Sequence, residues 1–143
     1  MIDISGKEDV KREAVAEGSI ILKRTTIDAI KNGNIKKGNV VEASKIAGVL
    51  GAKMTPQIIP HCHPIPLESV STGVEVRNDR VTVTCTIKAR YKTGVEMEAL
   101  TCVNSMLLTI WDMVKYLEKD EKGQYAHTEI SGIKVLKKVK QRD

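Results

Sequence analysis

Residues 70–87 read VSTGVEVRNDRVTVTCTI, and this stretch decides the fold class. Apolar and polar residues alternate along Val70–Val76 and again along Val81–Ile87, which is the period of a β-strand that buries one face. The pair Asn78-Asp79 between the two runs is typical of a hairpin turn. The sequence therefore predicts two adjacent antiparallel strands in the middle of the chain.

The segments around this hairpin predict a mixed α and β domain. A long helix is predicted after it, from about Val95 to Lys119, and a last short strand over Ile130–Leu136. Ahead of it we expect a strand, a short helix, a longer helix and a proline-rich loop, at Val10–Leu22, Thr25–Gly33, Val40–Met54 and Thr55–Pro66. The order β-α-α-β-β-α-β predicts an α+β fold, a mostly antiparallel sheet with helices packed on one face, as a single domain over residues 1–143.

Two local patterns support the first two helices. The run Thr25-Thr26-Ile27-Asp28 resembles a capping box, in which side chains bond the free amides at a helix start. The second helix is predicted from residues that lie close to one helical stripe, namely Val41, Ala43, Ile46, Ala47 and Leu50.

Composition places the chain among ordinary globular proteins. Hydrophobic residues make up 41% and charged residues 29% of its 143 residues. No apolar run approaches the roughly 20 residues that span a bilayer, and no secretory signal is visible at the start. Cys62, Cys85 and Cys102 are an odd number of cysteines at unrelated spacings, and we expect Cys85 and Cys102 to act as small buried hydrophobes. These features predict a cytoplasmic protein without a membrane segment.

The net charge of +5 permits an acidic partner. With one Trp, three Tyr and no Phe, the chain is poorly equipped to stack on unpaired bases, and we expect no nucleic-acid partner. A solvated basic tail is the simplest interpretation of the densest cationic run, although a phosphate-bearing small ligand would use the same charges. This run comprises Lys134, Lys137, Lys138, Lys140 and Arg142.

The predicted long helix carries charges at both ends. Glu96 and Glu98 in its first turn suit the positive end of the helix dipole without any function. Asp112 and Lys115 stand on a segment otherwise made of apolar residues, where unpaired charges cost several kcal/mol. They either pair with each other on the outer face or line a pocket.

Two further clusters suggest a site. Three prolines between residues 60 and 66 stiffen the loop that carries His61, Cys62 and His63. A metal site is disfavoured because no second pair of ligands is present. A structural or incidental role for the histidines is the other alternative, and we prefer a histidine placed for proton transfer or phosphate contact. Lys37, beside Gly38 at a helix start, is a weak candidate anion site, since such lysines are usually just solvated.

Helix geometry separates the two acidic ends. At about 1.5 Å rise per residue, Glu98 and Asp112 lie some 21 Å apart along one straight helix. They cannot both contact one small substrate from the same chain. If both serve one active site, two subunits must contribute to it, so a shared site at a symmetric homo-oligomer interface is the expected arrangement.

Taken together, the motifs resemble the molybdenum cofactor biosynthesis protein C family, the cyclic pyranopterin monophosphate synthases. The resemblance covers nearly the whole chain. It rests on seven segments in the same order: Met1–Ser5, Arg12–Ala14, Lys37–Val40, Ala43–Gly48, Pro60–Pro64, Gly94–Thr101 and Thr109–Lys115.

The resemblance implies a ferredoxin-like α+β fold and a lyase that uses no cofactor and no metal. Its substrate would be the GTP-derived 3′,8-cyclo-7,8-dihydroguanosine triphosphate, which is rearranged to the cyclic phosphate with release of pyrophosphate. A hexamer built of three dimers is also implied. The implied catalytic residues are Asp112, Lys115, Lys37 and His63, and the implied substrate contacts are His61, Cys62, His63, Met97, Glu98, Glu96 and Arg12.

The chain departs from the family pattern at its end. The family commonly closes with a glycine-rich segment containing two lysines, whereas Leu136–Asp143 contains no glycine. Lys138 keeps one lysine near this position. The alternative interpretation is a module without catalytic activity that binds a nucleotide, a phosphate or a metal.

Overall fold

The computed structural model describes residues 1–142, and Asp143 lies outside the described residues. Its elements are β1 (Val10–Ile21), α1 (Arg24–Lys31), α2 (Val40–Ile58), β2 (Leu67–Val76), β3 (Arg80–Tyr91), α3 (Glu96–Glu118) and β4 (Glu129–Gln141). The predicted element order and the α+β fold class are confirmed.

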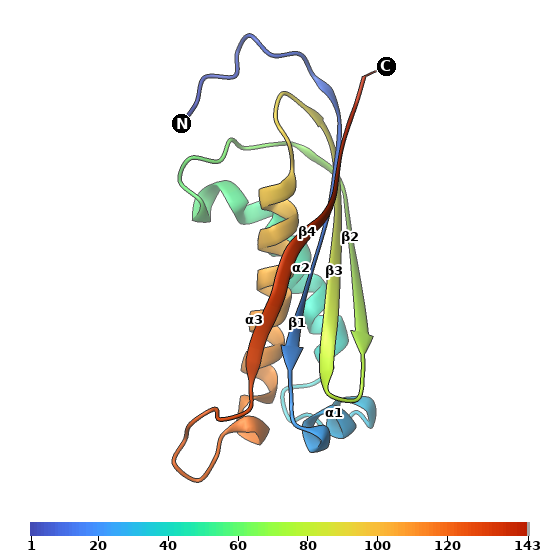
Figure 1. Ribbon diagram of the computed structural model, residues 1–143, viewed down its shortest axis with the longest axis vertical. Coiled ribbons are helices and arrows are strands. Elements are labelled where there is room, and N and C mark those ends of the chain that lie inside the picture. The colour runs from blue at the N-terminus through green and yellow to red at the C-terminus, as the bar shows by residue number, and fades with distance from the viewer. Residues whose placement is uncertain (143) are drawn as a thin grey trace.

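The strands form one antiparallel sheet in the order β2-β3-β1-β4. The predicted hairpin is the β2–β3 pair, in which Val76 faces Val81 across the turn. Helices α2 and α3 lie side by side on one face of the sheet, and α1 lies at the end where the β2–β3 turn is found (Figure 1). This is the ferredoxin-like arrangement, with β1 paired between β3 and β4.

The core lies between the sheet and α3. Alternate residues of β1 and β3 point toward the helices and are buried, while those between them face the other side of the sheet. The largest fully buried side chains of this layer are Ile20, Ile87, Met106, Leu107 and Ile110. Helix α3 is therefore held firmly along its length, and both of its ends reach the surface at fixed positions.

Helix α2 packs on α3 through small residues. A Cβ atom on Gly48 would lie 2.8 Å from Cγ of Met106, and one on Gly51 would overlap Ser105. The predicted apolar stripe therefore does not face the core. Its large members Ile46 and Leu50 are 63% and 54% exposed, and the exposed row continues along the same face, four residues apart, with Met54 and Ile58.

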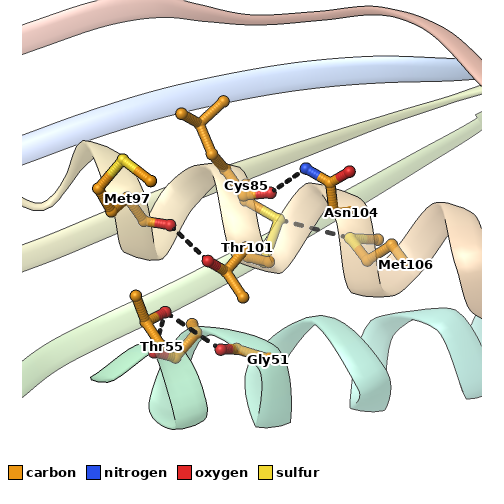
Figure 2. Close-up of a disulfide and its surroundings, with 10 residues drawn as sticks. Gly51, Thr55, Cys85, Met97, Thr101, Asn104 and Met106 are labelled. Atoms are coloured by element: carbon orange, nitrogen blue, oxygen red, sulfur yellow. Dashed lines mark hydrogen bonds between the residues drawn. A yellow bond between two sulfur atoms is a disulfide. The ribbon is translucent and has the colours of Figure 1, made fainter. Parts of the chain in front are cut away.

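A disulfide joins Cys85 of β3 to Cys102 of α3 (Figure 2). The prediction that these cysteines are buried was right, since both are 0% exposed. The prediction that they behave as simple hydrophobes was wrong, because strand and helix bring the two sulfur atoms into bonding contact across the core. Only Cys62 remains a free thiol.

Several predicted boundaries are corrected. No side chain caps α1, and the Thr26 hydroxyl donates instead to the buried Glu118 carboxylate. Helix α2 runs to Ile58 through Pro56, where a loop was predicted. Pro56 has no amide to donate, but the Thr55 hydroxyl donates to the Ala52 carbonyl at 2.9 Å and occupies the vacant acceptor.

The basic run at the end of the chain also differs from the prediction. Strand β4 continues to Gln141, five residues beyond the predicted end, and pairs along β1. The lysines from Lys134 to Lys140 therefore belong to a strand rather than to a solvated tail. Within residues 1–142, no helix has the length and hydropathy needed to cross a membrane.

Candidate active site

Near the C-terminal end of α3, two lysines meet on one carboxylate. Lys115 lies one turn after Asp112, with Nζ 3.1 Å from Oδ1. The Nζ of Lys37, from the loop before α2, lies 2.9 Å from Oδ2 and 3.1 Å from the backbone oxygen of Asp112. Both interpretations offered for Asp112 and Lys115 hold. They pair with each other, and they line an open hollow of about 420 Å³.

The position of Lys37 is fixed by its neighbours. The backbone amide of Lys36 donates to the Tyr116 hydroxyl at 2.9 Å, and the Lys36 Nζ lies 5.2 Å from the centre of the Tyr116 ring. Gly38 follows with φ of +111°, a conformation that favours glycine. The loop thereby directs Lys37 toward Asp112 of α3 rather than toward the first amides of α2.

The electrostatics keep Asp112 ionised. Hydrogen bonds from Lys37 and then Lys115 lower the pKa of the Asp112 carboxyl below its usual value. The cluster carries two cations on one carboxylate, and it remains open to solvent because Asp112 is 56% exposed. The same hollow is walled by Trp111 and Tyr125, whose rings meet edge to face at 5.1 Å. It can accept a planar group beside a source of protons.

A second cavity, of about 490 Å³, lies at the opposite end of α3. The proline-rich loop forms one wall and the first turn of α3 forms another. Six predicted site residues line it: His61, Cys62, His63, Glu96, Met97 and Glu98. The structure therefore confirms that these six residues are brought together, although it does not test their roles.

The carboxylates of this second cavity differ sharply from Asp112. Glu98 is only 3% exposed, and burial, together with the nearby charge of Glu96, raises its pKa to about 7. Among the described residues, neither Glu98 Oε2 nor Glu96 Oε2 has a hydrogen-bond partner. Burial also raises the pKa of the Cys62 thiol. The cavity thus presents a carboxyl group that is readily protonated and has unused hydrogen-bonding capacity.

The histidines of this cavity contact the first residues of the chain. His61 Nδ1 lies 3.0 Å from the Met1 nitrogen. His63 Nε2 lies 2.8 Å from the Ile2 carbonyl oxygen, so Nε2 carries the donated proton. Within residues 1–142, no three His, Cys, Asp or Glu side chains are grouped closely enough to hold a metal ion.

The predicted site residues thus fall into separate groups within one chain. Asp112, Lys115 and Lys37 form one group, and the six residues around Glu98 form another, some 21 Å away at about 1.5 Å rise per residue. Arg12 lines neither hollow, and its guanidinium donates to the carbonyl oxygens of Tyr91 and Lys92 at 3.4 Å and 3.2 Å.

Sequence reasoning missed two neighbours of these groups. Tyr116 orients the Lys37 loop, and Lys7 lines the cavity of Glu98. A signal existed for Tyr116, which follows Lys115 directly, whereas the position of Lys7 depends on the path of the first residues. Lys138, which the family pattern had singled out, lies 3.4 Å from Glu96 Oε1.

Comparison with known proteins gives a consistent result over the full length. A model described as the MoaC family matches residues 1–141. The chain is 56% identical to a probable cyclic pyranopterin monophosphate synthase of Sulfolobus acidocaldarius over 98% of both chains. It is 54% identical to one of Sulfurisphaera tokodaii, over 100% of this chain and 95% of the relative. One of Archaeoglobus fulgidus is 56% identical over 98% of this chain and 90% of the relative.

Proposed function

Because this chain belongs to the MoaC family, we propose that it acts as a cyclic pyranopterin monophosphate synthase in molybdenum cofactor biosynthesis. Its substrate is 3′,8-cyclo-7,8-dihydroguanosine 5′-triphosphate, and its products are cyclic pyranopterin monophosphate and pyrophosphate. The observation that carries the proposal is the convergence of Lys37, Lys115 and Asp112 at hydrogen-bonding distance, from segments 75 residues apart, within a full-length family match.

The cluster at Asp112 suits the proton transfers of this reaction. Opening and reclosing a purine-derived ring requires protons to be moved on and off nitrogen and oxygen. The ionised Asp112 accepts a proton, while Lys37 and Lys115 donate protons or stabilise negative charge on the phosphate as pyrophosphate leaves. The side chains act directly, and the proposal requires no cofactor.

The cavity at Glu98 suits recognition of the guanine-derived ring system. The unpartnered Oε2 atoms of Glu96 and Glu98 can accept hydrogen bonds from ring N–H groups. A Glu98 carboxyl with a pKa of about 7 can also donate to a ring carbonyl. His63 completes this wall as an acid or base, and His61, Cys62 and Met97 give the ring its contact surface.

We propose that association of subunits brings the Asp112 group and the Glu98 group together. Large apolar side chains are exposed in a row on α2, and Leu108 of α3 is 61% exposed as well. Helix faces of this kind are covered when a second copy binds, which also brings the Asp112 group of one copy toward the Glu98 group of its partner. We propose a homo-oligomer, a hexamer of three dimers, in which residues 1–143 form one catalytic domain acting in the cytoplasm.

An assay of pyrophosphate release from the cyclised GTP derivative tests this function. The wild-type protein should release pyrophosphate and form the cyclic pterin product, and D112N should lose about three orders of magnitude in kcat. The matched control is D28N, since Asp28 is also an exposed, ion-paired aspartate, 3.9 Å from Arg24. Substrate binding without product from the wild type would favour the module without catalytic activity.

A further inference from the structure

The last residue of α3, Glu118, carries a buried carboxylate that joins three parts of the chain. It is only 1% exposed, and both of its oxygen atoms accept hydrogen bonds. The Thr26 hydroxyl of α1 and the Lys23 amide, at 3.1 Å, donate to Oε2. The Thr128 hydroxyl donates to Oε1 at 2.7 Å. Burying a carboxylate is costly unless its oxygens are hydrogen-bonded, so a residue that only filled the core here would be apolar.

Glu118 holds both ends of the loop that connects α3 to β4 (Figure 1). Residues 119–128 leave the helix directly after Glu118 and return to the same carboxylate through Thr128, which is 8% exposed. Within the loop, the Asp120 carboxylate accepts two backbone amides of the turn that follows it, each at 2.9 Å. The loop is therefore ordered by its own hydrogen bonds and anchored at both ends by one side chain.

This loop supplies one wall of the hollow at Asp112. Its Tyr125 ring meets the Trp111 ring edge to face, with the ring centres 5.1 Å apart, and both rings line that hollow. Trp111 belongs to α3, whereas Tyr125 reaches it only because the loop folds back along the helix. The hydrogen bond from Thr128 to Glu118 thus fixes where the second ring lies.

We propose that Glu118 is a positioning residue for the reaction. Through Thr128 it holds Tyr125 against Trp111, so that the two rings form a wall on which a planar part of the substrate lies beside Asp112. Aromatic side chains offer a large rigid contact area to a flat ring system and lose little conformational entropy in doing so. The contact with the substrate rests on the proposed function, whereas the fixing of Tyr125 by Glu118 does not.

The two buried threonines on this carboxylate give a matched pair of variants. Removing the Glu118 side chain would break all three hydrogen bonds at once and endanger folding. T128V instead removes only the hydroxyl that anchors the loop, and T26V removes only the hydroxyl of α1.

Trp111 is the only tryptophan of the chain, so its fluorescence reports on the pairing of its ring with Tyr125. T128V should shift the emission to longer wavelength and make Trp111 easier to quench with acrylamide. T26V should do neither, although it should melt at a lower temperature because it loses a buried hydrogen bond. T128S keeps the hydroxyl and should emit as the wild type does.

Steady-state kinetics test the contact with the substrate. T128V should raise KM for the cyclised GTP derivative about tenfold and leave kcat within about twofold, because the wall binds the ring without transferring protons. T26V and T128S should keep the wild-type KM. Y125A should raise KM as T128V does, and adding T128V to Y125A should raise it no further, since Glu118 acts through Tyr125.

The results separate this proposal from the proposed function. Equal changes in Trp111 emission and quenching for T128V and T26V, or no change for either, would overturn the fixing of Tyr125 by Glu118. An active protein in which T128V keeps the wild-type KM, or raises the KM of Y125A further, would retain the function and overturn the positioning role. A protein that releases no pyrophosphate but exposes Trp111 in T128V alone would lose the function and retain the fixing of Tyr125.

Discussion

The carboxyl groups near the two ends of α3 lie in opposite environments. The Asp112 carboxylate is exposed and pairs with two lysines, which lower its pKa. The Glu98 carboxyl is buried, its pKa is raised to about 7, and among the described residues its Oε2 has no hydrogen-bond partner. Two carboxyl groups with pKa values pushed apart are a common basis for dividing acid and base roles. The difference shows that one helix holds two carboxyl groups in chemically distinct surroundings, and the predictions below test each end.

The largest effect is expected at the Asp112 end. Replacing Lys37 with Gln removes the shorter of the two ion pairs to Asp112 and should lower kcat about a thousandfold, or about 4 kcal/mol in activation free energy. Steady-state assays of pyrophosphate release measure this loss of kcat. The control is Lys31→Gln, since Lys31 is an exposed lysine whose side chain donates to Asn78 at 3.4 Å. Equal kcat values for K37Q and K31Q would show that Lys37 takes no part in the reaction.

At the other end, Glu98→Gln should stabilise the fold in a pH-dependent way. The carboxyl has a pKa near 7 when folded and near 4.5 when unfolded. The unfolded chain therefore releases its proton first, and wild-type stability falls as pH rises from about 4.5 to 7. Denaturant melts should show E98Q gaining roughly 3 kcal/mol over the wild type at pH 8 and nothing at pH 4. A constant difference across this range would contradict the raised pKa.

The Cys85–Cys102 disulfide ties the first half of α3 to β3, and its two cysteines are 17 positions apart in sequence. Breaking it with a reductant should cost about 3 kcal/mol of unfolding free energy, because the unfolded chain regains the entropy of an open loop. Hydrogen exchange should speed up more around Glu98 than around Asp112. Cys62→Ser is the control and should leave the response to reductant unchanged. A wild-type melting temperature that does not respond to reductant would show that the disulfide contributes little.

The smallest effect is expected for the stability of Asp112→Asn. Its carboxylate is exposed and paired only at the surface, so the loss of the pair should hardly change the melting temperature at pH 7. The contribution that exists is present above the normal aspartate pKa and is lost as pH falls through the lowered value. A large drop in melting temperature would mean that Asp112 is structural rather than catalytic.

The sequence predicted the order of the elements and named the candidate residues that make up both site groups, but it did not predict what depends on distant contacts. The alternation in Val81–Ile87 fixes a buried strand face, and the length of the apolar run fixes α3. The sequence did not indicate which face of α2 points outward, because glycine and serine rather than leucine fill the contact with α3. The disulfide depends in the same way on how β3 and α3 align across the core.

The site shows the same limit. The motifs around His63, Glu98 and Asp112 indicated the candidate site residues, whose roles stay predictions, and helix rise predicted the separation of Glu98 from Asp112. The pairing of Lys37 with Asp112 required the fold, since 75 residues separate them. The basic run was interpreted as a solvated tail because nothing local shows that β4 extends to Gln141 and brings Lys140 opposite Arg12.

Mixing two inactive variants tests most directly whether the two ends of α3 meet across a subunit interface. D112N and E98Q would each be purified, shown to lack pyrophosphate release, then unfolded and refolded together in equal amounts. If each active site takes its Asp112 and its Glu98 from different subunits, random pairing restores about a quarter of the wild-type activity. Mixed protein that assembles as the wild type does but stays as inactive as its parents would contradict the shared site.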